Sequence, residues 1–277
     1  MDLIGVLHLA PLPGAPTPSP GLDVVIDRAI ADARTLLRGG FRAAVVENIG
    51  DAPFDPGAVE PDVTACMTAV ALRVRQATGG ALALGINVLR NDARSALGVA
   101  LASKARFIRV NVHTGAAWTD QGLIQGRAAD TLRQRRRLGL APVGPPEPGW
   151  LSDPGDGSVR IVADVHVKHA TPAGQEDIAD AAADLYLRGG ADVVIVTGRH
   201  TGGAPVLDDI RRVRERLPAA PLWVGSGVQP DNVEHIAPLV DGAIVGTWLH
   251  RDADLRAPLD PHRVRRLVQA VSAAVPR

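Results

Sequence analysis

Short apolar runs alternate along the chain with longer segments whose apolar positions follow the period of a helix. Runs such as AAVVE and DVVIVT are continuous and rich in β-branched residues, which is typical of strands buried on both faces of a parallel sheet. The expected strands are Leu3–His8, Arg42–Asn48, Ala81–Asn87, Arg106–Asn111, Val159–Lys168, Asp192–Thr197, Leu222–Ser226 and Gly242–Thr247. The expected helices lie near residues 22–38, 61–78, 91–103, 126–139, 175–188, 206–216, 230–237 and 261–275.

This alternation predicts one α/β domain. Eight strands alternating with eight helices is the count of a (β/α)₈ TIM barrel, whereas the alternative, a doubly wound open sheet, rarely needs eight equal units. A length of 277 residues suits a single barrel, and no shift in composition marks a second domain. We therefore predict one TIM barrel over residues 1–277. A proline- and glycine-rich surface excursion at 141–158 precedes the fifth strand, on the face opposite the expected site.

Charge and composition exclude several classes of function. Acidic and basic residues number 30 each, which argues against a basic nucleic-acid-binding surface or a polybasic membrane surface. The chain has no apolar run of about 18 residues for a transmembrane helix, and its N-terminus lacks the pattern of a signal peptide. Cys66 is the only cysteine, so one chain cannot form a disulfide. We expect a cytoplasmic protein with no nucleic-acid partner, and homo-oligomerisation stays open.

The fifth expected strand, VRIVADVHVKHA, carries the clearest chemical signal. Its alternation places Asp164, His166 and Lys168 together on the face opposite its apolar residues. Lys168 is one of only two lysines, and a lysine amine can be desolvated and made reactive in a way that arginine cannot. We interpret these residues as an acid/base carboxylate, a proton carrier and an imine-forming, basic or clamping amine. An internal ion-pair network that merely fills the barrel is the alternative.

Other strand ends also carry polar side chains, and the C-terminal ends of the strands are where TIM-barrel active sites lie. Glu47 joins the expected catalytic residues. The expected substrate-binding residues are His8, Asn48, Asn87, Arg109, Asn111, His113 and Thr197. In the fourth strand, ARFIRVNVH, alternation places Arg109, Asn111 and His113 on one face. No cofactor is required by these patterns, although a divalent metal could be held by His8, Glu47, Asp164 and His166.

The last three strands end in glycine and small hydroxyl residues. Such ends let backbone N–H groups approach an anion, and strands seven and eight are where phosphorylated ligands often bind in TIM barrels. Ordinary turn chemistry is the alternative explanation for these glycines. The expected phosphate-binding residues are Gly198, Gly225, Ser226, Gly227, Gly246 and Thr247. The expected ligand is therefore a small phosphorylated metabolite.

Long motifs at the strand ends resemble one known family. They are HLAPLPGAP at 8–16, VENIGDAPF at 46–54, GINVLRNDA at 85–93, FIRVNVHTGA at 107–116, ADVHVKHA at 163–170, VTGRHTGGAP at 196–205, VGSGVQPDNV at 224–233 and DGAIVGTWLH at 241–250. The chain resembles the BtpA/SgcQ family, which is grouped with the ribulose-phosphate-binding barrels. The resemblance implies a phosphate-binding barrel but no single reaction. That family usually has lysine where His250 stands and lacks a stretch such as 142–158.

Together these patterns favour an enzyme of isomerase, epimerase or lyase type that acts on a small phosphorylated sugar or ribosyl metabolite. The family name, which comes from photosystem I biogenesis, implies an alternative: a non-catalytic assembly or stability factor. A metal-dependent hydrolase of a phosphorylated nucleoside is a third hypothesis. Residues 9–20 and 112–126, which follow strands one and four, are either lids over the site or simple connections.

Overall fold

A computed structural model describes residues 1–152, 157–167, 169–174, 177–198 and 207–274. Eight parallel strands form a closed barrel in the order β1-β11-β10-β9-β7-β4-β3-β2, which confirms the predicted fold. The barrel strands are β1 (Asp2–His8), β2 (Ala43–Glu47), β3 (Ala83–Asn87), β4 (Phe107–Val110), β7 (Arg160–Asp164), β9 (Val193–Val196), β10 (Leu222–Val224) and β11 (Gly242–Val245).

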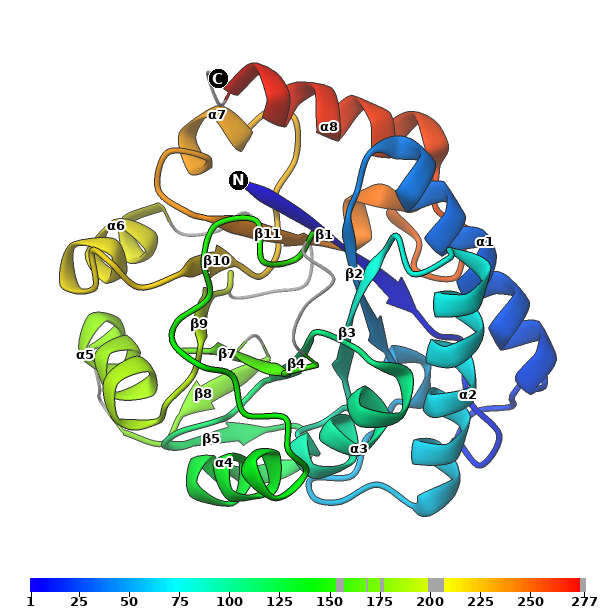
Figure 1. The fold of residues 1–277 in the computed structure, drawn as a ribbon, viewed down its shortest axis with the longest axis horizontal. Helices are drawn as coiled ribbons and strands as arrows, with labels where there is room; N and C mark the ends of the chain where they lie inside the picture. Colours follow the sequence, from blue (N-terminus) through cyan, green and yellow to red (C-terminus); the bar gives the residue numbers. More distant parts are fainter. Residues whose placement is uncertain (153–156, 168, 175–176, 199–206, 275–277) are drawn as a thin grey trace.

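Helices surround the ring of strands (Figure 1). They are α1 (Leu22–Gly39), α2 (Pro61–Ala77), α3 (Ala93–Ser103), α4 (Ala128–Arg137), α5 (Ile178–Ala183), α6 (Leu207–Arg216), α7 (Val233–Ile236) and α8 (Pro261–Ala274). Helix α5 continues as a π-helical turn, η2 (Asp184–Arg188), and short 3₁₀ turns are η1 (Ile49–Asp51), η3 (Thr247–Leu249) and η4 (Arg251–Ala253). Within the described ranges, no helix is both long and apolar enough to cross a bilayer.

The barrel strands are buried on both faces, as their continuous apolar runs predict. In β2, Val46 packs in the outer cluster between strands and helices, while Val45 packs in the inner cluster that fills the barrel. The two clusters follow the strict alternation of side chains along a strand. The register of β1, β2 and β3 sets His8, Glu47 and Asn87 side by side at the C-terminal end.

Aromatic rings fill the other end of the barrel. Trp223 stacks on Trp150 with ring centroids 6.1 Å apart, and Phe107 meets both rings edge-on. Glycines on neighbouring strands make room for them, since a Cβ atom on Gly85 would lie 2.2 Å from Phe107 and one on Gly242 would lie 2.6 Å from Trp223. The large rings therefore fit only because adjacent strand positions lack side chains.

Trp150 belongs to the 141–158 segment, whose residues 141–149 lie mostly at the surface while the next two residues turn inward. The neighbouring Leu151 is buried in the inner cluster, and the carbonyl of Trp150 accepts a hydrogen bond from Arg106. The side chains of Trp150 and Leu151 pack in the inner cluster and close the N-terminal end of the barrel.

The fifth expected strand is shorter than predicted: β7 ends at Asp164. Residues Ala170–Pro172 form a separate strand, β8, which pairs with the hairpin β5 (Ala116–Thr119) and β6 (Gly122–Gln125) in a second sheet. Val167 packs with Val112 and Ile124 of this sheet rather than on the barrel. The alternation of apolar and polar residues continues past Asp164, because such a pattern is the same whichever sheet a strand belongs to. The 112–126 segment is accordingly an ordered hairpin.

Candidate ligand-binding site

A buried ion pair lies at the C-terminal end of the barrel. Arg109 of β4 donates from Nε and Nη2 to the two carboxylate oxygens of Asp164 at 3.0 and 2.9 Å. Asp164 also accepts hydrogen bonds from Asn111 Nδ2 at 3.1 Å and from Thr197 Oγ1 at 2.6 Å. Four donors thus converge on one carboxylate, which is the arrangement that makes burial of an ion pair tolerable.

A second carboxylate and a second amide extend this cluster. Glu47 Oε2 lies 3.9 Å from Arg109 Nη1, and Asn87 Nδ2 donates to Asn111 Oδ1 at 3.1 Å. Burial acts to lower the pKa of Arg109, but the charge and hydrogen bonds of Asp164, together with the charge of Glu47, raise it above its ordinary value. Arg109 is therefore a permanent cation facing two acidic side chains.

The structure brings together most of the residues predicted from the strand ends. His8, Glu47 and Arg109 line one cleft, and Gly225, Ser226, Gly227, Gly246 and Thr247 line its other side. Behind Arg109 lies a hydrogen-bonded cluster made of Asn87, Asn111, Asp164 and Thr197. The cleft has a cavity volume of about 90 Å³ and opens to solvent.

Four described residues of the predicted site, Asn48, His166, Gly198 and His113, lie outside both the cleft and the cluster behind it. Both amide atoms of Asn48 are used within the protein, Oδ1 by the N–H of Leu89 at 2.8 Å and Nδ2 by Asp51 at 2.9 Å. His166 follows the end of β7 and lines a separate small cavity next to Asp164. Gly198 is buried after β9 but is not in the cleft lining. Lys168 lies outside the described residues, and the other lysine, Lys104, ends α3 before β4 begins, at the opposite end of the barrel.

His113 is the fourth, and its ring points away from the cleft. Nε2 hydrogen-bonds the carbonyl of Gly189 at 2.9 Å, just before β9 begins. The predicted alternation fails here because β4 ends at Val110, and Asn91 then pairs with the backbone of Val112 through both its amide atoms. The chain leaves the barrel at this point and carries His113 into the outer layer.

The burial of His113 predicts a loss of stability in mild acid. Burial lowers its pKa, mainly by desolvation, so the folded protein keeps the ring neutral under conditions where the same histidine in the unfolded chain takes up a proton. An unfolded histidine titrates near pH ~6.5, so the free energy of unfolding should fall as the pH drops below that value, by at most about 1.4 kcal/mol per pH unit for this group. Urea unfolding of the parent and of His113→Gln at about pH 7.5 and about pH 5.5, on either side of that value, measures the difference in slope.

We expect His113→Gln to lose less stability than the parent on acidification. The matched control is His262→Gln, which replaces an exposed histidine on α8 and should leave the slope unchanged. Equal slopes for the parent and His113→Gln would contradict this assignment.

The glycine side of the cleft offers donors that the protein does not use. Ser226 is buried, and its Oγ has no hydrogen-bond partner among the described residues. The backbone N–H groups of Ser226, Gly227 and Thr247 donate to no backbone oxygen in the described part of the chain. A buried donor left unpaired costs free energy, so the Ser226 hydroxyl indicates a partner that completes it. Gly227 and Thr247 are half-buried, and their N–H groups belong to residues that line the same cleft.

Two of these glycines also have a packing reason. A Cβ atom on Gly246 would lie 2.6 Å from His8 Cε1, and one on Gly225 would lie 2.3 Å from Thr197 Oγ1. Asn232 fixes the following loop, because its Oδ1 accepts from the N–H of Gln229 and its Nδ2 donates to the carbonyl of Gly227. The glycine ends thus hold the cleft in shape as well as exposing backbone donors.

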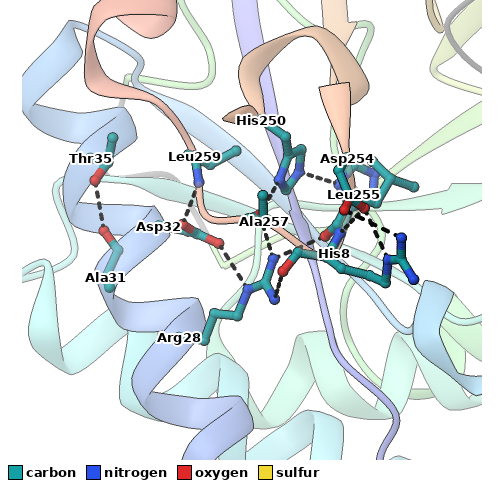
Figure 2. A network of polar contacts seen from close by, with 11 residues as sticks. His8, Arg28, Ala31, Asp32, Thr35, His250, Asp254, Leu255, Ala257 and Leu259 are labelled. Atoms are coloured by element: carbon teal, nitrogen blue, oxygen red, sulfur yellow. Dashed lines mark hydrogen bonds and ion pairs between the residues drawn. The ribbon is translucent and has the colours of Figure 1, made fainter. Parts of the chain in front are cut away.

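One residue that holds the cleft-lining His8 from behind was not among the predicted site residues. His250 is completely buried and lies 2.8 Å from His8, measured from its Nε2 to His8 Nδ1 (Figure 2). It follows the one-turn helix η3, and neither an alternating nor a helical pattern signals its position. The sequence drew attention to this position only through the resemblance to a family that usually has lysine there.

In the part of the chain that the structure describes, acidic and histidine side chains do not gather into a metal centre. Within the described residues, no group of three or more histidine, cysteine, aspartate or glutamate side chains is arranged to hold a metal ion. The set considered from the sequence, His8, Glu47, Asp164 and His166, is divided because the carboxylate of Asp164 is already bound to Arg109. These four residues therefore do not fit a resident metal.

Comparison with known proteins assigns the chain to a family. The model of the BtpA family matches residues 1–273. The chain belongs to the BtpA family. Within it, the chain is 39% identical over 270 residues to the photosystem I biogenesis protein BtpA of Synechocystis, covering 98% of this chain and 88% of that one. A relative from Thermococcus kodakarensis is 42% identical over 267 residues, covering 96% and 94% of the two chains.

Solved structures agree with the barrel fold of this BtpA-family chain. Thiamine phosphate pyrophosphorylase from Pyrococcus furiosus matches with a TM-score of 0.59 at 14% identity, covering 99% of this chain and 97% of that one. 3-Hexulose-6-phosphate synthase from Salmonella typhimurium matches with a TM-score of 0.58 at 13% identity, covering 99% and 100%. At such low identity these likenesses show the fold alone.

Proposed function

We propose that this BtpA-family protein is an enzyme of isomerase, epimerase or lyase type acting on a small phosphorylated sugar or ribosyl metabolite. The observation that carries the proposal is a set of donors in the cleft: the buried hydroxyl of Ser226, which has no partner among the described residues, and the backbone N–H groups of Ser226, Gly227 and Thr247, which donate to no backbone oxygen there. These donors come from the ends of β10 and β11, where phosphate binds in many TIM barrels.

The opposite wall supplies groups suited to the carbon skeleton. Glu47 and His8 face the same cleft as the glycine ends, with the Arg109 cation between them and Asp164. A carboxylate and an imidazole within one cleft can exchange protons with a bound sugar, and a fixed cation can stabilise negative charge that develops on an oxygen. His166 and Lys168 keep the catalytic roles proposed from the sequence, beside Asp164 on the chain.

The names of structurally similar proteins support a phosphorylated compound as the substrate. Thiamine phosphate pyrophosphorylase and 3-hexulose-6-phosphate synthase carry a phosphorylated compound in their names and share this barrel. The name of the Synechocystis relative instead favours an assembly role in photosystem I biogenesis. A protein with only that role has no need of unpaired donors in a cleft, and this difference separates the two hypotheses.

Thermal unfolding with a panel of phosphorylated probes tests the proposal. The panel holds ribose 5-phosphate, other sugar phosphates, nucleotides and inorganic phosphate. A probe at 100 times its dissociation constant should add about 2.7 kcal/mol to the free energy of unfolding. For a chain of this size that corresponds to a rise in Tm of roughly 5–10 °C.

Two serine variants make the result specific. Ser226→Ala removes the unpaired hydroxyl and should weaken the shift, while Ser272→Ala, at an exposed position on α8, should leave it unchanged. EDTA should have no effect, whereas loss of the shift in EDTA would favour the metal-dependent hydrolase. No shift with any probe would overturn the proposal in favour of the assembly role.

A further inference from the structure

We propose that His8 is the proton acceptor of the cleft, and that His250 is a positioning residue which holds neutral His8 in the tautomer with its hydrogen on Nδ1. This inference rests on the proposed function for the identity of the proton donor, a phosphorylated metabolite. The tautomer itself follows from the contacts of His250 alone.

The chain of hydrogen bonds has one direction. His250 Nδ1 lies 2.7 Å from the carbonyl oxygen of Ala257, and a carbonyl oxygen can only accept, so Nδ1 carries a hydrogen. In neutral His250 the other ring nitrogen, Nε2, is then an acceptor. Its partner at 2.8 Å is His8 Nδ1, which must donate. The remaining nitrogen of neutral His8, Nε2, therefore has no hydrogen and can take up a proton.

His250 is kept neutral and fixed by its surroundings. Burial lowers its pKa by desolvation, which outweighs the opposite effects of the Ala257 carbonyl and of the Asp32 and Asp254 charges, while Arg28 adds to the lowering. These are the charged groups that face it from α1 and from the loop after η4. His8, on β1, is its titratable neighbour toward the cleft.

The acceptor carbonyl is itself held in place (Figure 2). The guanidinium of Arg28, on α1, donates to the carbonyls of Leu255, Arg256 and Ala257. Asp32, one turn later, accepts from the N–H of Leu259 at 3.0 Å. Helix α1 thereby ties down the 255–259 loop, and the loop in turn orients His250.

His8 lies at the cleft end of the hydrogen-bonded series formed by the Ala257 carbonyl, His250 and His8, which we call the relay. Gly246, just after β11, lies close to His8 Nε2, since a Cβ atom there would lie 3.0 Å from this nitrogen. When a C–H or O–H bond of the ligand breaks, its electron pair stays on the ligand and the proton forms an N–H bond at Nε2. The resulting imidazolium keeps its Nδ1–H bond to His250, and a hydrogen bond from a charged donor is stronger than one from a neutral ring.

Nitrogen NMR of ligand-free protein labelled with ¹⁵N-histidine tests this relay. The chain has eight histidines, and the His8 signals are those missing from His8→Gln. At a pH where His8 is neutral, we expect its Nε2 to show the shift of an unprotonated ring nitrogen and its Nδ1 that of a protonated one. The reverse pattern in the parent protein would overturn the proposal.

Two substitutions of His250 distinguish its role as a hydrogen-bond acceptor for His8 from its role in filling space. His250→Leu removes the acceptor and should lower the ratio of the Nδ1–H to the Nε2–H tautomer of His8 by about tenfold. His250→Gln offers an amide oxygen near the position of Nε2 and should restore most of the ratio. The exposed control His262→Gln should leave it unchanged. An unchanged ratio in a folded His250→Leu variant would also overturn the proposal.

The same samples keep this inference distinct from the proposed function. Inorganic phosphate titrated into the parent probes the glycine ends, whereas the tautomer is measured without ligand. If phosphate binds but His8 carries its hydrogen on Nε2, the proposed roles of His8 and His250 are wrong while the proposed function stands. The expected tautomer without binding of any phosphorylated probe defeats the proposed function and the catalytic role of His8, but leaves the positioning role of His250 intact.

Discussion

Replacing Asp164 with alanine should lower the free energy of unfolding by about 3–5 kcal/mol. The substitution leaves the fully buried guanidinium of Arg109 without its bidentate partner, and it removes the acceptor used by Asn111 and Thr197. An uncompensated buried charge is among the most destabilising changes a fold can undergo. Denaturant unfolding at neutral pH measures the loss.

Two comparisons isolate the buried pair. Asp130→Ala breaks an exposed ion pair with Arg127 on the outer layer and should cost less than about 1 kcal/mol. The double variant Arg109→Met with Asp164→Leu should be more stable than Asp164→Ala, because it removes both charges instead of one. A loss below about 1 kcal/mol for Asp164→Ala would contradict the ion-pair account.

Trp223→Ala should cost a similar amount, about 3–5 kcal/mol, at the other end of the barrel. Trp223 is 1% exposed and packs between Trp150 and Phe107, so its removal leaves a cavity that rigid neighbouring strands cannot close. Trp118, on the β5–β6 hairpin, is 57% exposed, and Trp118→Ala serves as the matched control. Equal losses for the two tryptophan variants, measured by denaturant unfolding, would show that the aromatic cluster does not stabilise the barrel.

The barrel itself could be predicted from the sequence because each signal was local. Continuous apolar runs marked strands buried on both faces, and apolar positions with the period of a helix marked the segments between them. Signals that depended on a distant partner were lost. Val167 fits a longer β7 by its alternation, yet it packs on the second sheet. Trp150 lies in a proline- and glycine-rich stretch, and nothing near it in sequence shows that its partner is Trp223.

The candidate site was predicted in the same uneven way. Alternation and strand ends correctly gathered Glu47, Arg109 and Asp164, because the C-terminal ends of parallel strands meet at one face. These patterns could not show that Asp164 forms an ion pair with Arg109, because the two residues lie on different strands. Seven positions separate His250 from the carbonyl that orients it, in a loop without a regular period. The role of such a residue is visible only in three dimensions.

The most direct test of the central claim is a crystal structure of the protein grown with ribose 5-phosphate. The account predicts a phosphate group between the ends of β10 and β11, within hydrogen-bond distance of Ser226 Oγ and of the backbone N–H groups of Gly227 and Thr247. The sugar should lie toward His8 and Glu47. A ligand bound elsewhere, with Ser226 Oγ still unpaired at saturating ribose 5-phosphate, would contradict it.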